Sequence, residues 1–158
     1  MKVTRNEAIQ KLKELGIRMT TQRELLLHYL YERLSHPSAE QLYEAIYADY
    51  PKVVSITTVY NNLRLLREQR LVKEFYIHHT GTARYDTNVQ PHHHLYCTSC
   101  HSVTDYAAAG SLPTLASGRL EPVQELPPGF ITEQVYLEIS GMCEACSQPQ
   151  PLRREIAI

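Results

Sequence analysis

Two short cysteine motifs constrain this chain more than any other feature of its sequence. Each has two cysteines separated by two residues, and they are Cys97-Thr98-Ser99-Cys100 and Cys143-Glu144-Ala145-Cys146. That gap lets two thiolates of one tight turn bind the same cation, and two such turns complete the tetrahedral sulfur site of structural zinc. The alternative is two disulfides in a secreted domain, but Lys11, Lys13 and Glu14 interrupt any apolar core of an N-terminal secretory signal. We therefore predict that Zn²⁺ is bound by Cys97, Cys100, Cys143 and Cys146.

The second half of the chain is predicted to consist mainly of strands. Residues 131–140 alternate between apolar and polar side chains and lead into the second motif, while a strand around His94 leads into the first. Zinc would then join two sheet segments and contribute on the order of 10 kcal/mol to folding. Residues 106–129 are rich in Pro and Gly, so any helix there should be short or broken. We expect the tail, residues 148–158, to be mobile.

The first half of the chain carries start signals for four helices. Three capping boxes precede apolar stripes, namely Thr4 with Glu7, Thr21 with Glu24 and Ser38 with Gln41. A fourth helix is predicted from Ser55 to about Arg70, because Val59, Leu63 and Leu66 recur at helical spacing. Residues 71–77 and 83–86 then read as strands around a turn. Three helices, a recognition-type helix and a hairpin predict a winged helix-turn-helix.

The fourth predicted helix has a polar face that suits DNA. Arg can reach guanine or phosphate, Asn can pair with adenine, and a helix N-terminus with hydroxyl groups favours phosphate. The face comprises Thr57, Thr58, Tyr60, Asn61, Arg64 and Arg67. The alternative is an ordinary solvated helix face.

The two halves of the chain differ in charge. Lys and Arg outnumber Asp and Glu by 12 to 9 in residues 1–80, whereas residues 81–158 contain 4 Lys and Arg against 8 Asp and Glu. This asymmetry indicates different partners for the two halves.

A second set of possible metal ligands surrounds the first cysteine motif. His92 and His94 are two residues apart, so on a strand they point to the same face while His93 points away. Asp86, Asp105 and the turn residue His36 could complete the set, which is His36, Asp86, His92, His94 and Asp105. Three imidazoles and two carboxylates suit Fe²⁺, Mn²⁺ or Zn²⁺ better than a soft metal.

These residues resemble those of the ferric uptake regulator (Fur) superfamily of bacterial metal-dependent repressors over nearly the whole chain. The matching motifs are Thr20-Thr21-Gln22-Arg23, His36-Pro37-Ser38-Ala39, Thr58-Val59-Tyr60-Asn61-Asn62-Leu63, His92 to Cys100 and Gly141 to Cys146. Within the superfamily the chain is most similar to the peroxide-sensing (PerR) branch, because Asp86 and Asp105 stand where iron-responsive members often have glutamate.

The resemblance implies an α+β protein with an N-terminal winged helix-turn-helix domain (residues 1–86), a hinge (87–91) and a C-terminal α/β dimerisation domain with the zinc site (92–147). It implies a regulatory site at His36, Asp86, His92, His94 and Asp105, and it adds Thr21 and Arg23 to the DNA-binding residues. A metal joining His36 to the second domain would favour a homodimer that fits a near-palindromic operator.

In the peroxide-sensing branch, Fe²⁺ in such a site leads to oxidation of a ligand histidine and loss of DNA, whereas Mn²⁺ gives a peroxide-resistant repressor. By resemblance, the oxidised residues here should be His36 and His92. The alternative within the class is an iron, zinc or manganese uptake regulator that responds to metal level.

Other classes of protein fit the sequence less well. A zinc deaminase needs His-x-Glu before Pro-Cys-x-x-Cys, and the chain has neither pattern. A two-His-one-carboxylate oxygenase would share only the ligand types, and a zinc-ribbon adaptor would leave the helices unexplained. We therefore expect a regulator, not an enzyme. No apolar run approaches the ~18 residues of a membrane helix, so we expect a cytoplasmic protein without membrane contact.

Overall fold

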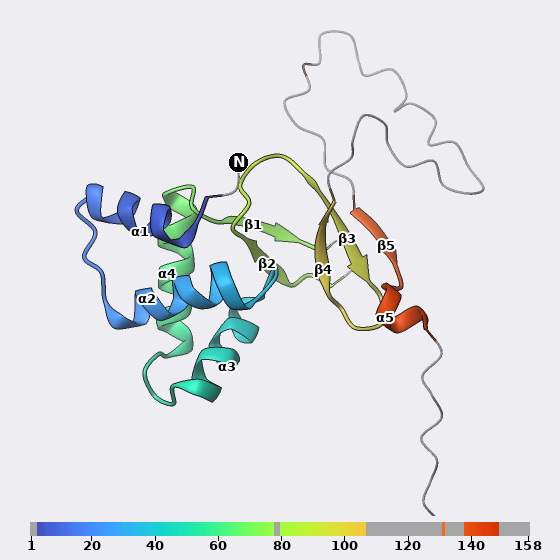
Figure 1. Cartoon of the computed structure of the whole chain (residues 1–158), viewed down its shortest axis with the longest axis horizontal. Helices are drawn as coiled ribbons and strands as arrows, with labels where there is room; N and C mark the ends of the chain where they lie inside the picture. Colours follow the sequence, from blue (N-terminus) through green and yellow to red (C-terminus); the bar gives the residue numbers. More distant parts are fainter. Residues whose placement is uncertain (1–2, 78–79, 107–130, 132–137, 149–158) are drawn as a thin grey trace, which may run out of the picture.

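The computed structural model describes residues 3–77, 80–106, 131 and 138–148. In this part of the chain all helices except the short last one gather at one end and a three-stranded sheet lies at the other, with a two-stranded sheet between them (Figure 1). The helical end contains α1 (Arg5–Glu14), α2 (Thr21–His28), the π-helical turn η1 (Tyr29–Arg33), α3 (Ala39–Asp49) and α4 (Ile56–Glu68). We call these elements the helical module. The architecture is therefore a mixed α and β fold.

Side-chain caps set the starts of the helices. The capping boxes predicted at Thr4 and Ser38 are confirmed. Each of these side chains accepts a hydrogen bond from the backbone N–H three residues on, and the Glu7 or Gln41 side chain accepts one from the backbone N–H of the capping residue. The box predicted at Thr21 is wrong. Thr20 has extended backbone angles and caps α2 by accepting from the N–H of Arg23, so Thr21 is already the first helical residue.

A continuous apolar core holds the helical module together. Its fully buried side chains come from α1, α2, α3 and α4 at helical spacing, and they include Leu12, Leu27, Leu42, Val59 and Leu63. Burying one such side chain stabilises the fold by roughly 1.5–3 kcal/mol. The predicted apolar stripe of α4 is confirmed, because Val59, Leu63 and Leu66 are completely buried while the opposite face is exposed.

The strands form two separate sheets. In the first, β1 (Lys73–Tyr76) pairs antiparallel with β2 (Ala83–Asp86). In the second, the central strand β3 (His93–Cys97) pairs antiparallel with β4 (Val103–Tyr106) and parallel with β5 (Glu138–Gly141), which leads into the short helix α5 (Glu144–Ser147). We call β3, β4, β5 and α5 the sheet module. The predicted strand at 131–140 is described only from residue 138, and the segment 107–130 and the tail 149–158 lie outside the described residues.

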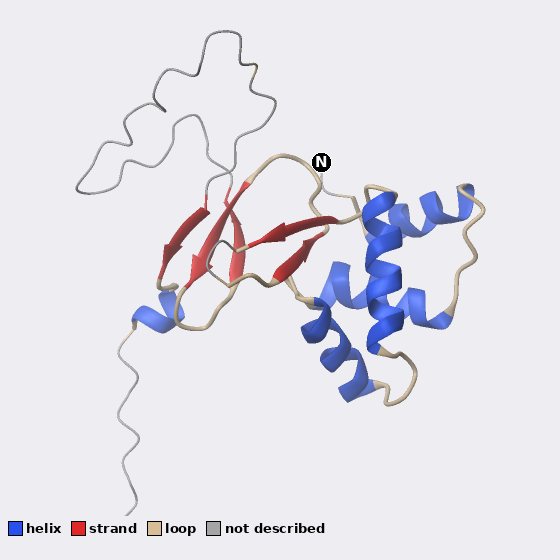
Figure 2. Cartoon of the chain, turned by 180° about the vertical axis from the view of Figure 1, so that it is seen from behind, coloured by secondary structure: helices blue, strands red, loops and turns tan. Residues whose placement is uncertain are grey.

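A second, small core joins the two-stranded sheet to the sheet module. Ile77, Tyr96 and Val103 are buried together, and Phe75 of β1 packs against them. On the other side of the two-stranded sheet, Tyr85 donates its backbone N–H to the carbonyl of Pro37 at 3.0 Å. The turn at residues 35–37 therefore lies next to β2, where the two modules meet (Figure 2). None of the described helices is long and apolar enough to cross a membrane.

Candidate metal centres and a polar helix face

The four cysteines lie in one cluster at the far end of the sheet module. Cys97 ends β3, Cys100 lies in the turn after it, and Cys143 and Cys146 belong to the first turns of α5. All four are free thiols, and their sulfur atoms lie within 4.8 Å of one another. The Cys100 and Cys143 sulfurs are 3.8 Å apart. Two sulfurs at ~2.3 Å from a tetrahedral ion would be separated by about 3.8 Å, so this spacing fits a bound zinc ion.

Backbone amides prepare this cluster for a cation. N–H groups of Cys100 and Cys143 point at the Cys97 sulfur, the latter at 3.3 Å, and they lower the pKa of that thiol to about 6. Hydrogen bonding with Ser102 also lowers the pKa of Cys100. Because the thiolate is the form that binds metals, both shifts favour metal binding near neutral pH. A hydrogen bond with Ser99 lowers the pKa of Cys146, but contacts with the other three cysteines outweigh it and raise this pKa to about 11.

The second cluster forms where the helical and sheet modules meet. It contains the five predicted residues, which are His36, Asp86, His92, His94 and Asp105, and one ligand atom from each lies within 4.8 Å of all the others. His36 comes from the turn after η1, Asp86 ends β2, and Asp105 is opposite His94 in the β3–β4 pair. The structure therefore brings together residues that are up to 69 positions apart in the sequence.

Distances within this cluster resemble those between the ligands of one small cation. His36 Nε2 lies 2.6 Å from Asp105 Oδ1, and His92 Nε2 lies 2.8 Å from Asp86 Oδ2. The Nε2 atoms of His92 and His94 are 3.0 Å apart. Two nitrogens bound at ~2.1 Å and at right angles would have about this separation. His92 precedes β3 and is not part of the strand, but its imidazole and that of His94 point to the same side, as their two-residue spacing predicts.

Unsatisfied polar atoms are a second sign that the cluster fits a cation. His36 Nε2, Asp86 Oδ2 and Asp105 Oδ1 are buried and have no hydrogen bond of normal geometry among the described residues. Native proteins rarely leave such atoms unpaired, because burial without a partner costs about 1–3 kcal/mol. A divalent ion would satisfy all three. The Asp86 side chain is only 2% exposed, so its charge in particular requires a partner.

Neighbouring groups orient two of the imidazoles and keep the Asp86 carboxylate ionised. Ser35 Oγ lies 2.8 Å from His36 Nδ1, and the carbonyl of Gln90 lies 2.7 Å from His92 Nδ1, which leaves both Nε2 atoms facing the cluster. Burial raises the pKa of the Asp86 carboxyl, but contacts with the His36 and His94 imidazoles and the Asn88 amide outweigh it, so the pKa lies well below its ordinary range.

The backbone at His36 adopts a conformation that the sequence does not reveal. Its φ of +48° lies in the left-handed region, and the next residue is Pro37, which normally requires an extended neighbour. Such a conformation costs on the order of 1–3 kcal/mol in a residue other than glycine and is common at functional sites. This turn directs the His36 imidazole away from the helical module and toward the strands.

Arg84 is a functional candidate that the sequence analysis missed. Its side chain is buried between the modules and donates to the His36 carbonyl at 3.3 Å, to Gln41 Oε1 at 2.5 Å and to the His101 carbonyl at 3.5 Å. These partners belong to the His36 turn, the cap of α3 and the turn that follows Cys100. Arg84 lies two residues before Asp86 on β2 and therefore shares its face of the strand. This spacing was the only available signal, since no spacing rule identifies the distant partners of Arg84.

The predicted DNA-binding face of α4 is exposed. Thr57, Tyr60, Asn61 and Arg64 face solvent, whereas Thr58 is half-buried and shares a hydrogen bond with the capping residue Ser55 at 2.8 Å. On α2, Thr21 is exposed at the first position. The Arg23 side chain is half-buried and donates to Asn62 Oδ1 of α4 at 2.9 Å, so it ties α2 to α4.

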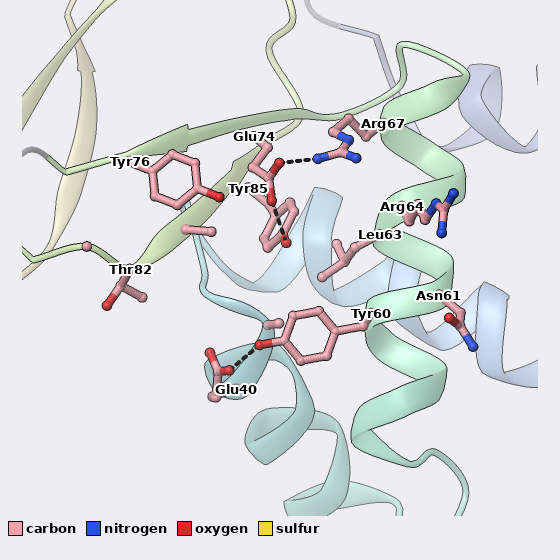
Figure 3. Close-up of a pocket in the computed structure, with 13 residues that line it drawn as sticks. Glu40, Tyr60, Asn61, Leu63, Arg64, Arg67, Glu74, Tyr76, Thr82 and Tyr85 are labelled. Carbon is pink, nitrogen blue, oxygen red and sulfur yellow. Dashed lines mark hydrogen bonds and ion pairs between the residues drawn. The ribbon is translucent and has the colours of Figure 1, made fainter.

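A groove of about 610 Å³ separates α4 from the two-stranded sheet (Figure 3). Tyr60, Arg64 and Arg67 line it from α4, and Glu74 and Tyr85 line it from the strands. The groove lies on the far side of β1 and β2 from the five-residue cluster, so the two-stranded sheet connects both features.

The fold and its two ligand clusters define a two-module metal-binding protein in which one candidate site is built from both modules. Residues 14–111 match the sequence model of the ferric uptake regulator family. The peroxide operon regulator of Bacillus subtilis is 36% identical over 91% of this chain and 94% of its own length. The peroxide-responsive repressor PerR of Staphylococcus aureus is 33% identical over 89% of each chain. The chain therefore belongs to the ferric uptake regulator family.

Solved structures agree with this assignment at the level of the fold. The ferric uptake regulator Fur of Helicobacter pylori superimposes with a TM-score of 0.65 at 21% identity, covering 95% of this chain and 98% of its own. A zinc-bound manganese uptake regulator gives a TM-score of 0.64 at 23% identity, over 86% of this chain and 98% of that chain.

Proposed function

We propose that this protein is a metal-dependent DNA-binding transcriptional repressor that senses peroxide. One observation carries the proposal: five ligand atoms from both modules converge within 4.8 Å, at His36, Asp86, His92, His94 and Asp105. The sequence relatives support the peroxide signal, because a peroxide operon regulator and a peroxide-responsive repressor match over most of the chain. Their names favour peroxide over a simple response to metal level.

The helical module and the β1–β2 pair would form the DNA-binding domain, a winged helix-turn-helix of residues 1–86. Residues 87–91 would be the hinge and 92–147 the dimerisation domain. The DNA-binding residues would be Thr21, Arg23, Thr57, Thr58, Tyr60, Asn61 and Arg64. Of these, Arg23 would act mainly by holding α4 in place, since its guanidinium is engaged by Asn62. A homodimer would place two such α4 helices on a near-palindromic operator.

The two clusters would have separate roles. The four cysteines suit structural Zn²⁺, and the imidazole and carboxylate set suits regulatory Fe²⁺ or Mn²⁺. His36 belongs to the helical module and His94 to the sheet module, so binding one ion to both holds the modules in the arrangement described above. This arrangement would be the one that binds DNA, and regulatory metal would raise its population.

Oxidation of a ligand would release the modules. Bound Fe²⁺ would supply the electron that cleaves peroxide next to the ligands. We propose His36 and His92 as the oxidised residues. Phe75 stacks on the His94 imidazole at a centroid distance of 4.1 Å and an angle of 5°, which shields one face of that ring. An oxygen atom added to His36 or His92 weakens its Nε2 as a ligand, and the inter-module contact is lost.

The test is an anaerobic titration of binding to a pool of random duplexes, followed by peroxide. We expect Fe²⁺ and Mn²⁺ to select and tighten binding to a near-palindromic subset, and peroxide to abolish binding of the Fe²⁺ form only. Mass spectrometry should then show one added oxygen on the His36 peptide or the peptide of His92 and His94. Metal-independent binding, or unmodified histidines in an Fe²⁺ protein that has lost DNA, would overturn the proposal.

A further inference from the structure

The groove between α4 and the two-stranded sheet contains two carboxylates, although we propose that this surface meets a polyanion. Figure 3 shows Glu40 of α3 and Glu74 of β1 pointing at side chains of α4. Glu74 contacts Arg67, and Glu40 accepts a hydrogen bond from the Tyr60 hydroxyl at 2.5 Å. Arg64, just outside these pairs, is bonded to Glu68 at 3.0 Å. Tyr60, Arg64 and Arg67 of α4 are therefore each already engaged by an acid.

Glu74 is the carboxylate that is held most firmly. Its Oε2 atom contacts Arg67, while its Oε1 atom accepts from the hydroxyl of Tyr85 at 3.0 Å. Tyr85 is 5% exposed and the Glu74 side chain is 18% exposed, whereas the Arg67 side chain is 48% exposed. Arg67 can therefore swing toward solvent, but Glu74 stays at the wall of the groove. The negative charge remains in place when DNA approaches.

The hydrogen bonds made by Glu74 and Glu40 also shift the pKa values of Arg67 and Glu40 toward the charged forms. The hydrogen bond with Glu74 raises the pKa of Arg67, and that with Tyr60 lowers the pKa of Glu40. A phosphate that binds Arg67 must replace the carboxylate, and it also meets the repulsion of Glu74. Since non-specific DNA affinity comes almost entirely from contacts between cations and phosphates, such an acid reduces that affinity directly.

We propose that Arg67 is a DNA phosphate contact and that Glu74 restrains it, so that Glu74 sets the affinity of this protein for DNA of any sequence. Glu40 restrains Tyr60 in the same way on the opposite side of the groove. This inference rests on the proposed DNA-binding function and goes beyond it by naming the residues that limit the affinity. Glu74 acts here through Arg67, so it is a positioning residue.

A double-mutant cycle tests the inference. The variants are Glu74→Gln, Arg67→Gln and their combination, and the probe is a labelled random-sequence duplex titrated by anisotropy with Mn²⁺ at several NaCl concentrations. Gln keeps the size of Glu74 and an acceptor for Tyr85. At low salt we expect Glu74→Gln to bind roughly 3–10 times more tightly, as removal of one nearby charge predicts. The slope of log K against log salt should steepen by about 0.9, the value for one further phosphate contact.

The controls separate this effect from general charge and from folding. Glu14→Gln removes a charge on α1 that contacts only Gln10 among the bonds described, so binding should change by less than about twofold. In the Arg67→Gln background, the gain from Glu74→Gln should fall to less than about twofold, because only the direct repulsion between Glu74 and phosphate is then removed. If Glu74→Gln does not fold, the exposed variant Glu40→Gln serves in its place and should also tighten binding.

The titration distinguishes a failure of the proposed DNA-binding function from a failure of the role of Glu74. If the wild-type protein binds no duplex at low salt with Mn²⁺, the DNA-binding function itself fails. If it binds but Glu74→Gln binds equally or more weakly, or keeps its gain without Arg67, then Glu74 does not restrain Arg67 and the inference is wrong.

Discussion

Replacing Arg84 with Met should uncouple the two modules. Met removes every donor while filling much of the same space. The short bond to Gln41 Oε1 is a charge-assisted hydrogen bond worth about 1.5–3 kcal/mol, whereas the contacts to the two carbonyls at 3.3 and 3.5 Å are long and contribute about 0.5 kcal/mol each. Removing a buried charge returns part of this loss, since its desolvation cost disappears as well. The net destabilisation should be about 2–3 kcal/mol.

Urea unfolding of the zinc-loaded protein measures this effect. With an m value of about 2 kcal/mol per molar, the midpoint should fall by about 1 M. Mn²⁺ affinity should also fall, because Arg84 holds the turn that carries His36, whereas zinc content should be unchanged. Arg64→Met is the matched control. The Arg64 side chain is 74% exposed and, within the part of the chain that the structure describes, pairs only with exposed Glu68, so this variant should stay within about 0.5 kcal/mol. An Arg84→Met midpoint equal to that of Arg64→Met, with normal Mn²⁺ affinity, would refute the role of Arg84.

Three further predictions concern the metal clusters and the core. Cys100→Ser should lose bound zinc and melt at a markedly lower temperature, because structural zinc contributes on the order of 10 kcal/mol to folding. Retention of one zinc ion per chain in elemental analysis would contradict the four-sulfur site. His92→Ala should abolish the Mn²⁺ binding that calorimetry measures, whereas His93→Ala, at a neighbouring position outside the cluster, should keep it. Equal loss of Mn²⁺ binding in both variants would argue against the ligand set. Burial, together with the bond to Asp49, raises the pKa of Tyr29 to about 12 from an ordinary value of 10.0. The fold thus favours the neutral phenol, so the contribution of Tyr29 to stability should be constant below pH 10 and be lost as the pH rises toward 12. Burial raises the pKa values of Tyr31 and Tyr85 as well, so Tyr29→Phe should make this slope shallower without abolishing it.

The local signals in the sequence predicted most helix starts and strand positions. Ser38 and Gln41 specify a start because both bonds of the capping box form within four residues, and the period of Val59 and Leu63 specifies which face of α4 is buried. Adjacent Thr20 and Thr21 gave an ambiguous signal, since either hydroxyl could cap and only the packing of α2 chooses between them. The left-handed turn at His36 was not predictable, because a histidine before proline favours an extended backbone.

The candidate metal sites depended on two different kinds of information. The cysteine cluster follows from spacing alone, since both pairs are local and need only one long-range contact. In contrast, the five-residue cluster combines residues from a turn, three strands and the segment before β3, and no single member is distinctive in sequence. The residue types suggested it only as a possible ligand set, resemblance to a family gave it a regulatory role, and its geometry required the fold. Arg84 was missed for the same reason, because its partners at His36, Gln41 and His101 become neighbours only after folding.

The central claim is that one cation connects the helical module to the sheet module through His36. The most direct measurement compares the wild-type protein with His36→Ala, both zinc-loaded, in operator binding as a function of added Mn²⁺ under anaerobic conditions. We expect Mn²⁺ to tighten DNA binding by the wild-type protein and to have no effect on His36→Ala, although both retain zinc and fold. An unchanged Mn²⁺ response in His36→Ala would contradict it.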